Sequence, residues 1–394
     1  MSRGLVWLMA VGAGLTVAGI YYAQPLLDLM RQDLGMSVFA AGFIITASQL
    51  GYALGLAFLV PLGDLMERRK LVVAMTAGGS VFLAAMAFAP YSSVLLAAAL
   101  IVGALSTVAQ VLVAFAATLA APQERGRVVG TVMSGLLLGI LLARTVAGYL
   151  GQYAGWRAVF AVFSATTMAL ALALYRGLPP HREHLGVSYP ALLKSIVSLL
   201  VEEPLLRLRA LYGAIAFAAF SVLWTPLALM LSRPPYRFSA GAIGMFGFAG
   251  VAGTLAASLA GRMSDRGWSH SMTGITAALL ALSWLPLKLG DHSLSMLIVG
   301  ILLFDFAVQG LHITNQGRIY SLRPDARSRI TSAYMASFFA GGVLGSAVSS
   351  FAYAHYGWNG VCLAGTVLGA AATLRWLLSL KNTTTPGPEN RRKT

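Results

Sequence analysis

Apolar runs dominate this chain and restrict it to one class of fold. About twelve runs of roughly 18–25 residues recur along the sequence, and each is long enough to cross a bilayer as a helix. Of the 394 residues, 58% are hydrophobic and 10% are charged, whereas a soluble domain is about 25% charged. So few charges cannot cover a chain of this length in water. The sequence therefore predicts an all-α polytopic membrane protein with twelve transmembrane helices.

The lysines and arginines predict how the chain lies in the membrane. With both termini in the cytoplasm, 22 of the 28 basic residues fall on the cytoplasmic side, five on the opposite side, and Arg144 inside a run. The net charge of +15 then lies against an anionic leaflet, which favours membrane lipid rather than nucleic acid as the partner. We expect a multi-pass protein of a bacterial cytoplasmic (inner) membrane, with both termini cytoplasmic.

One long polar stretch divides the chain into two pseudo-symmetric bundles. We predict an N-terminal six-helix bundle over residues 1–176, a cytoplasmic linker over 177–207, a C-terminal six-helix bundle over 208–380, and a disordered cytoplasmic tail over 381–394.

The two bundles repeat each other in the same sense. "PLGDLMERRK" follows the second run and "AGRMSDRGWSH" follows the eighth, which aligns Asp64 with Asp265. Residues 125–156 align with 327–358 at an offset of 202. Parallel repeats of this kind, related by an axis along the membrane normal, are typical of transporters.

These features resemble the major facilitator superfamily over essentially the whole chain. The 12-span drug/proton antiporter and sugar-efflux branch is the most similar, on the segments "YYAQPLL" (21–27), "GLLLGILLAR" (135–144) and "NQGR" (315–318). The sequence departs from the family at Val60 and Glu67, where the loop motif has glycines, and "IVGALSTVAQ" (101–110) has no arginine. The resemblance implies two helical bundles around a central cavity, which rock to give alternating access.

The resemblance also implies a conformational gate at the cytoplasmic helix ends. In the family, the loop aspartate faces a helix N-terminus of the other half, where an anion gains ~0.3–1 kcal/mol. That contact breaks as the halves rock. The matching residues here are Asp64, Arg68, Arg69, Asp265 and Arg266. The alternative is that both aspartates are solvated loop acids.

Among the 13 acidic residues, Asp305 alone lies near the middle of an apolar run. A charged carboxylate there costs at least ~2.5–3.5 kcal/mol, so it must face a cavity, find a partner or stay protonated. Burial favours the protonated form, and access to water or a cation favours the ionised form. We predict Asp305 as a proton-coupling site. The alternative is a structural hydrogen bond to a neighbouring helix.

A polar stripe continues from Asp305 along one helix face. Gln309, His312 and Gln316 follow at i+4, i+7 and i+11, so the four residues share a face over about 16 Å. In the resembling family this helix lines the cavity, so Gln309 and Gln316 are predicted to line the substrate cavity. Imidazole titrates near neutral pH. For His312, proton coupling and a hydrogen-bonded packing role both stay open.

Arg144 is the second intramembrane charge and a further candidate for proton coupling. Its cost at that depth forces it inward or into a pairing. Two roles stay open, as counter-ion to Asp305 across the halves or as a donor to backbone carbonyls. The repeat places Ser346 at the equivalent position, so the charge breaks the symmetry.

Four other residues are predicted to line the substrate cavity, namely Tyr22, Gln24, Gln110 and Trp224. Aromatic rings with a polar tip suit an amphipathic or ring-shaped substrate. Because Tyr22 lies near the end of a run, an interfacial aromatic belt is the alternative there.

Together these features predict a secondary active transporter of a small organic compound, monomeric and driven by protons, with export by antiport favoured. Proton symport or facilitated uptake is the close alternative, and a non-transporting membrane sensor is a more distant one. The sequence contains no nucleotide-binding motif and no metal-ligand spacing. We therefore expect no enzyme activity, no cofactor and no metal.

Overall fold

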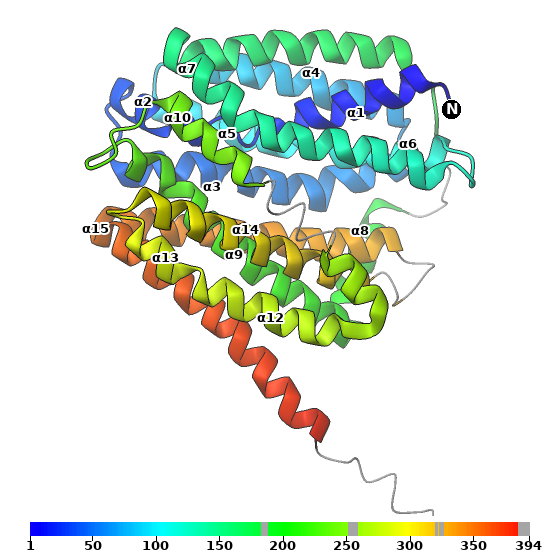
Figure 1. Cartoon of the computed structure of the whole chain (residues 1–394). Helices are drawn as coiled ribbons and strands as arrows, with labels where there is room; N and C mark the ends of the chain where they lie inside the picture. Colours follow the sequence, from blue (N-terminus) through cyan, green and yellow to red (C-terminus); the bar gives the residue numbers. More distant parts are fainter. Residues whose placement is uncertain (183–187, 251–258, 320–321, 323–326, 385–394) are drawn as a thin grey trace, which may run out of the picture.

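The described part of the computed structural model is helical throughout. It comprises residues 1–182, 188–250, 259–319, 322 and 327–384, and these contain no strand. The all-α prediction is therefore confirmed for these residues. Figure 1 shows the helices running side by side in two groups, with α1, α4, α5, α6 and α7 in one and α9, α12, α13, α14 and α15 in the other.

The elements of the first half follow one another with short connections. They are α1 (Arg3–Ala18), η1 (Gln24–Leu26), α2 (Leu27–Asp33), α3 (Val38–Leu54), η2 (Gly55–Leu59), η3 (Val60–Asp64), α4 (Arg68–Ala87), α5 (Ser92–Ser106), α6 (Val108–Leu119) and α7 (Arg125–Gly177).

The second half has a similar series. After α8 (Tyr189–Glu202) come α9 (Pro204–Leu231), α10 (Ala240–Met245), η4 (Phe246–Ala249), η5 (Ser264–Trp268), α12 (Ser269–Leu282), α13 (Trp284–Leu289), α14 (Leu294–Ile319) and α15 (Arg327–Thr384). The predicted linker thus contains a helix, α8, which we did not expect from its polar composition.

Two helices are about twice as long as a membrane span. The described residues contain eight helices that are long and apolar enough to cross a membrane, and two of these spans lie in α7, of 53 residues, and α15, of 58 residues. Each of these helices breaks at a glycine with positive φ, at Gly155 (81°) and Gly357 (60°), a conformation that favours glycine. The two breaks are related by the repeat offset of 202. Each long helix therefore has the length of two spans, and the count of twelve helices stays a prediction.

Small residues let the helices of each half pack closely. In α7, a Cβ at Gly135 or Gly139 would collide with the α1 backbone. In α15, a Cβ at Gly341 or Gly345 would collide with the α9 backbone in the same way. The repeat in the sequence thus gives a repeated helix seam, which depends on close backbone approach.

The two halves meet along α3, α7, α9 and α10. Thr145 Oγ1 on α7 donates a hydrogen bond to the Gly244 carbonyl on α10 at 3.0 Å. Ser221 Oγ on α9 donates to Gln49 Oε1 on α3 at 3.1 Å, and both side chains are buried. Helix α3 also packs against α15. Polar contacts therefore cross the seam at the depth where the intramembrane charges lie.

The linker and the tail only partly match their predictions. The linker is tied to the first half, because the Arg68 amide donates to the His181 carbonyl at 2.9 Å and the Tyr189 hydroxyl donates to the Phe58 carbonyl at 2.7 Å. Helix α15 continues to Thr384, a few residues into the predicted tail. The rest of that tail, 385–394, lies outside the described residues.

Candidate functional site

Asp305 faces the interior of the helix bundle. It lies in the middle of α14 with 4% of its surface exposed, while its neighbours Leu302 and Leu303 are 39% and 38% exposed. The apolar side of α14 therefore faces outward and the carboxylate inward. Its Oδ1 accepts a hydrogen bond from Trp224 Nε1 of α9 at 3.4 Å. This inward orientation agrees with the expectation that an acid at this depth does not face lipid.

Arg144 reaches the same region from the other half. It lies on α7, is 5% exposed, and donates from Nε to Gln24 Oε1 at 2.5 Å. Its Cζ lies 4.2 Å from the ring centroid of Trp224, 4.9 Å from that of Tyr21 and 5.7 Å from that of Phe220. The guanidinium is thus enclosed by aromatic rings from both halves, a favourable cation–π arrangement.

The indole of Trp224 links the two ionisable groups. Arg144 stacks against the ring and Asp305 accepts a hydrogen bond from its N–H. Among the described residues, Arg144 makes no ion pair with Asp305 within 4 Å and no hydrogen bond to a backbone carbonyl. The indole lies between the two charged groups, and Gln24 Oε1 accepts the hydrogen bond from Nε. The two roles proposed for Arg144 therefore stay predictions.

His312 lies on the predicted face but turns towards α15. Its Nδ1 is 2.9 Å from the Tyr334 hydroxyl, and its ring centroid is 4.6 Å from that of Phe338. Seven residues, or about 10 Å of helix, separate it from Asp305. Gln309 and Gln316 are half-buried on the same helix. A proton-coupling role for His312 stays a prediction, with a packing bond as its observed contact.

Two of the predicted cavity residues make their contacts inside the first half. The Tyr22 ring stacks on Phe163 with a centroid separation of 3.8 Å, and its hydroxyl donates to the Leu15 carbonyl at 3.4 Å. Gln110 Nε2 donates to the Tyr52 hydroxyl at 3.4 Å. The structure therefore brings Gln24 and Trp224 to Arg144 and Asp305, but not Tyr22 or Gln110.

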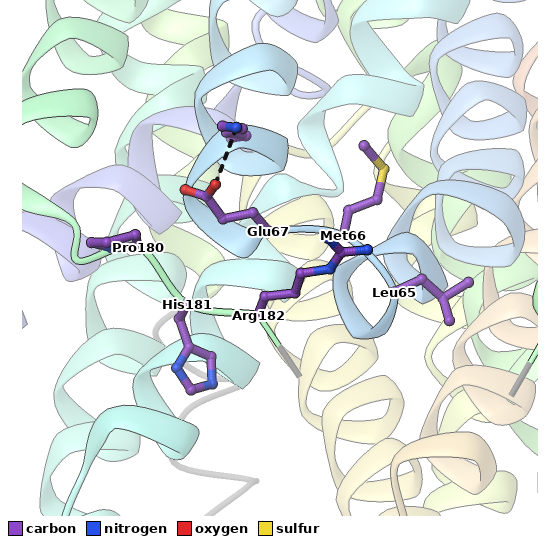
Figure 2. Close-up of a pocket in the computed structure, with 7 residues that line it drawn as sticks. Leu65, Met66, Glu67, Pro180, His181 and Arg182 are labelled. Atoms are coloured by element: carbon purple, nitrogen blue, oxygen red, sulfur yellow. Dashed lines mark ion pairs between the residues drawn. The ribbon is translucent and has the colours of Figure 1, made fainter. Parts of the chain in front are cut away.

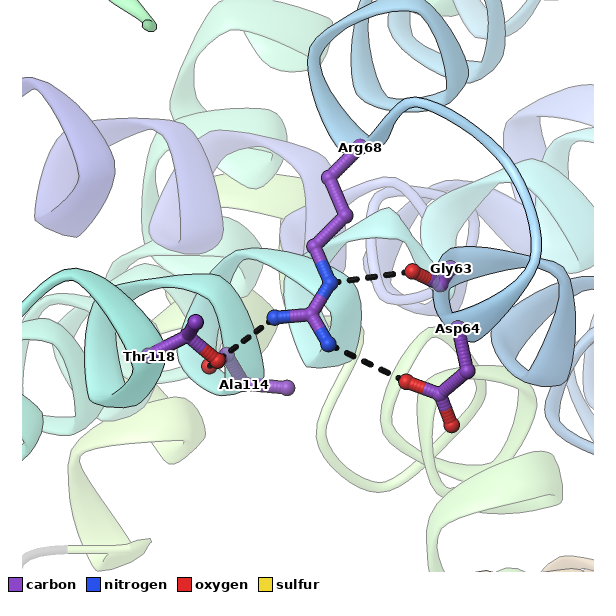
Figure 3. A network of polar contacts seen from close by, with 5 residues as sticks. All are labelled: Gly63, Asp64, Arg68, Ala114 and Thr118. Atoms are coloured by element: carbon purple, nitrogen blue, oxygen red, sulfur yellow. Dashed lines mark hydrogen bonds and ion pairs between the residues drawn. The ribbon is translucent and has the colours of Figure 1, made fainter. Parts of the chain in front are cut away.

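The predicted gate is ordered around Arg68 in the first half. Its Nε donates to the Gly63 carbonyl at 2.9 Å, Nη1 to Thr118 Oγ1 at 2.6 Å, and Nη2 to Asp64 Oδ1 at 3.1 Å (Figure 3). Arg68 therefore holds η3 against α6. This network lies within one half, so the contact of Asp64 with the other half stays a prediction.

The structure also describes the side chains of two further gate residues, Arg69 and Arg266. Arg69 Nε lies 3.6 Å from Glu67 Oε1. Arg266 is exposed in the middle of η5, beside Gly267 with φ of 86°. The side chain of Asp265 lies outside what the structure describes.

A cavity of about 490 Å³ lies between this loop and the linker, away from Asp305 (Figure 2). It is lined by Leu65, Met66, Glu67, Lys70, Pro180, His181 and Arg182. Glu67 and Lys70 form an ion pair of 3.3 Å at its edge.

The sequence analysis did not single out Phe220 beside Arg144, nor the burial of Arg209 elsewhere in the second half. Tyr21 and Phe220 complete the ring enclosure of Arg144, and Phe220 precedes Trp224 by one helical turn, a spacing that would have signalled it. Arg209, counted among the cytoplasmic basic residues, is instead buried and donates to Thr273 Oγ1 at 2.8 Å and Asn315 Oδ1 at 3.3 Å.

Repeated apolar helices, a same-sense pseudo-repeat and ionisable side chains at the seam between the halves define a multi-pass membrane transporter of two related halves. The family follows from the sequence itself. The chain belongs to the Major Facilitator Superfamily, whose sequence model matches residues 7–316 and 236–394.

Relatives and solved structures agree with this assignment. A protein of Escherichia coli strain K12 that is named as an uncharacterized transporter, YgaY, is 51% identical over 379 residues, covering 95% of each chain. The inner membrane transport protein YnfM of the same strain is 25% identical over 360 residues, covering 90% of this chain and 86% of its own. A bacterial homologue of the human lysosomal transporter Spinster, in an inward-facing and occupied conformation, has a TM-score of 0.78 over 97% of this chain and 98% of its own. At 14% identity, that last likeness shows the fold alone.

Proposed function

We propose that this protein is a proton-coupled secondary transporter of a small organic compound, with Asp305 as its proton site. One observation carries the proposal: a buried carboxylate, held by an indole N–H, faces a cation from the other half across the same indole. An ionisable group at this depth marks a functional site by default in membrane proteins.

Rocking of the two halves would change the surroundings of Asp305. Arg144 is carried by α7 and Trp224 by α9, so a rigid-body movement between the halves alters the distance between the guanidinium and the indole. With Arg144 near, the ionised form of Asp305 is favoured, and with Arg144 withdrawn the protonated form is favoured. A cycle through both arrangements would bind and release one proton.

Two directions of coupling are candidates. Export by proton antiport is favoured by the resemblance to drug and sugar-efflux transporters. Uptake by proton symport is the second candidate, favoured by the cation near Asp305, which would repel a positively charged substrate from the proton site. We also propose that the protein lies in a bacterial inner membrane with cytoplasmic termini, supported by its 22-to-5 distribution of basic residues.

Proton movement in proteoliposomes tests this proposal. Purified protein is reconstituted with a pH-sensitive dye inside, and a panel of organic anions, amines and neutral compounds is added outside. Acidification of the lumen on addition of a compound indicates symport, and alkalinisation indicates antiport. No proton movement with any compound of the panel, in protein shown to be folded, contradicts proton coupling.

A further inference from the structure

Arg144 carries a buried charge that its neighbours only partly compensate. Its Nη2 is buried and has no hydrogen-bond partner, and no carboxylate of the described residues lies within 4 Å. Among the described residues, the Arg144 side chain makes one hydrogen bond, from Nε to Gln24 Oε1, and that amide oxygen is neutral.

The aromatic rings around Arg144 do not replace a counter-ion. A desolvated cation–π contact is worth about 2 kcal/mol, whereas taking an ion out of water costs several kcal/mol. The missing interaction is a charge-assisted hydrogen bond, and a carboxylate forms it with a guanidinium in a bidentate geometry. The unpartnered Nη2 is therefore suited to an anionic group.

The position of this donor fits a substrate site. Gln24 and Tyr21 reach Arg144 from the first half, and Phe220 and Trp224 reach it from the second. Parting of the halves moves the second-half rings away from the guanidinium and opens space beside it. The apolar part of a ligand would then lie against rings that already pack on a planar cation.

We infer that Arg144 binds the carboxylate of an organic anion, whose apolar or aromatic part lies against Tyr21, Phe220 and Trp224. This inference rests on the proposed transport function and adds the chemical class of the substrate.

The charge near Asp305 then determines how substrate and proton are coupled. An anion on Arg144 neutralises the cation that favours ionised Asp305, so Asp305 takes up a proton more readily. By reciprocity, protonated Asp305 strengthens anion binding. Proton and anion bind together and move in one direction, which favours the symport candidate over antiport.

The other groups around Asp305 leave Arg144 as its electrostatic partner. Helix α9 contributes the Trp224 indole. Helices α12 and α13 face α14 with Thr276 and Trp284. The titratable His312 on α14 is bonded to Tyr334 of α15. Tyr21 lies beside Arg144 rather than beside Asp305.

A binding assay on the purified full-length protein tests the anion site. Benzoate, phenylacetate, indole-3-acetate and octanoate are each compared with the matching amide, and benzylamine serves as a cation of similar shape. We expect at least one carboxylate to raise the unfolding midpoint, and its amide and benzylamine to leave it unchanged. The substitution Arg144→Gln should weaken carboxylate binding about 10–100-fold, the loss of a charged hydrogen bond, and Arg144→Lys should weaken it less.

Arg209→Gln is the matched control, because Arg209 is an equally buried arginine away from the aromatic enclosure. Carboxylate binding should persist in this variant. The inference is overturned if no carboxylate of the panel binds, if acid and amide bind equally, or if Arg144→Gln binds as tightly as the unchanged protein. Equal loss in Arg209→Gln also overturns it, because the effect would then come from removing any buried charge.

The pH dependence tests the linkage and separates the two proposals. Between about pH 8 and 6, where simple carboxylates stay ionised, affinity should rise as pH falls, and in Asp305→Asn it should not vary. A carboxylate affinity that decreases as the pH is lowered from about 8 to 6 contradicts the linkage. Carboxylate binding at Arg144 without proton flux contradicts coupling and leaves the anion site standing. Proton-coupled flux of amides or amines alone contradicts the anion site and leaves coupling standing.

Discussion

At the scale of single residues, Trp224 explains why two intramembrane charges coexist without an ion pair. Its ring packs on Arg144 and its N–H binds Asp305, so one side chain contacts both charges from opposite sides of the seam. A direct buried pair would hold the halves together strongly and oppose rocking. An intervening indole lets each charge keep a favourable contact while the halves separate.

Substitution of Asp305 by Asn should abolish proton coupling and preserve folding. The amide keeps the size of the side chain and still accepts the Trp224 hydrogen bond, but it cannot exchange a proton. We expect no accumulation of substrate against a gradient in proteoliposomes, with an unfolding midpoint close to that of the unchanged protein. Normal uphill transport by this variant would make Asp305 a structural residue.

Two substitutions of Trp224 separate its two contacts. Trp224→Phe keeps a ring against Arg144 and removes the N–H donor, whose loss to a charged acceptor costs about 1.5–3 kcal/mol. The coupled transport rate of Trp224→Phe should fall about tenfold or more. The rate of Trp224→Leu should fall further, because this change also removes the cation–π contact. Equal rates in Trp224→Phe and the unchanged protein would show that the hydrogen bond has no part in coupling.

The members of this site were largely predictable, and their contacts were not. Asp305 and Arg144 stand out because charges are costly in an apolar run. Gln24 and Trp224 stand out as residues with a polar tip within apolar runs. Their mutual orientation depends on how α7 and α9 rotate against each other, which a periodic pattern does not encode. Tyr22 aligns with Trp224 in the repeat, yet packs on Phe163 because its half offers a stacking partner there.

At the scale of helices, the glycine seams follow the sequence repeat closely. Small residues four apart recur at matching positions of both halves, and the structure places them against α1 and α9. Helix α8 was not predicted, since a polar, proline-containing stretch signals a linker more strongly than a helix. The sequence predicted separate spans in these two regions, and the structure joins them into α7 and α15 with a break in helical geometry at Gly155 and Gly357.

The seam between α1 and α7 should tolerate no side chain at its centre. Gly139→Leu forces a side chain into the α1 backbone at Gly14, and overpacking costs about 1–3 kcal/mol or more. We expect a lower unfolding midpoint in a thermal-shift assay. Gly126→Leu is the control, because a Cβ at Gly126 meets nothing within 4 Å and should leave the midpoint nearly unchanged. Equal effects of both would contradict the seam.

At the scale of the whole molecule, the proposed symport predicts the charge that one transport cycle moves across the membrane. One proton and one monovalent anion that cross together carry no net charge. Exchange of a proton for the same anion would carry two charges, each worth about 2.3 kcal/mol per 100 mV of membrane potential.

Initial uptake of a bound carboxylate should therefore depend on the pH gradient and not on the potential. A potassium diffusion potential imposed with valinomycin, negative inside, should leave the initial rate unchanged within about twofold, since no net charge crosses the field. An acidic exterior should raise that rate. Strong acceleration by the potential alone would indicate a charged cycle and contradict symport of a monovalent anion with one proton.

The glycine breaks in α7 and α15 bear on how movement spreads through the protein. Gly155 in α7 and Gly357 in α15 are the sole residues of these helices that depart from helical geometry. The two segments of each helical hairpin are therefore joined without a flexible loop. A tilt of the helical segment that carries Arg144 should therefore move the antiparallel segment that follows it. Insertion of a few flexible residues at either glycine would uncouple the movements of the two segments.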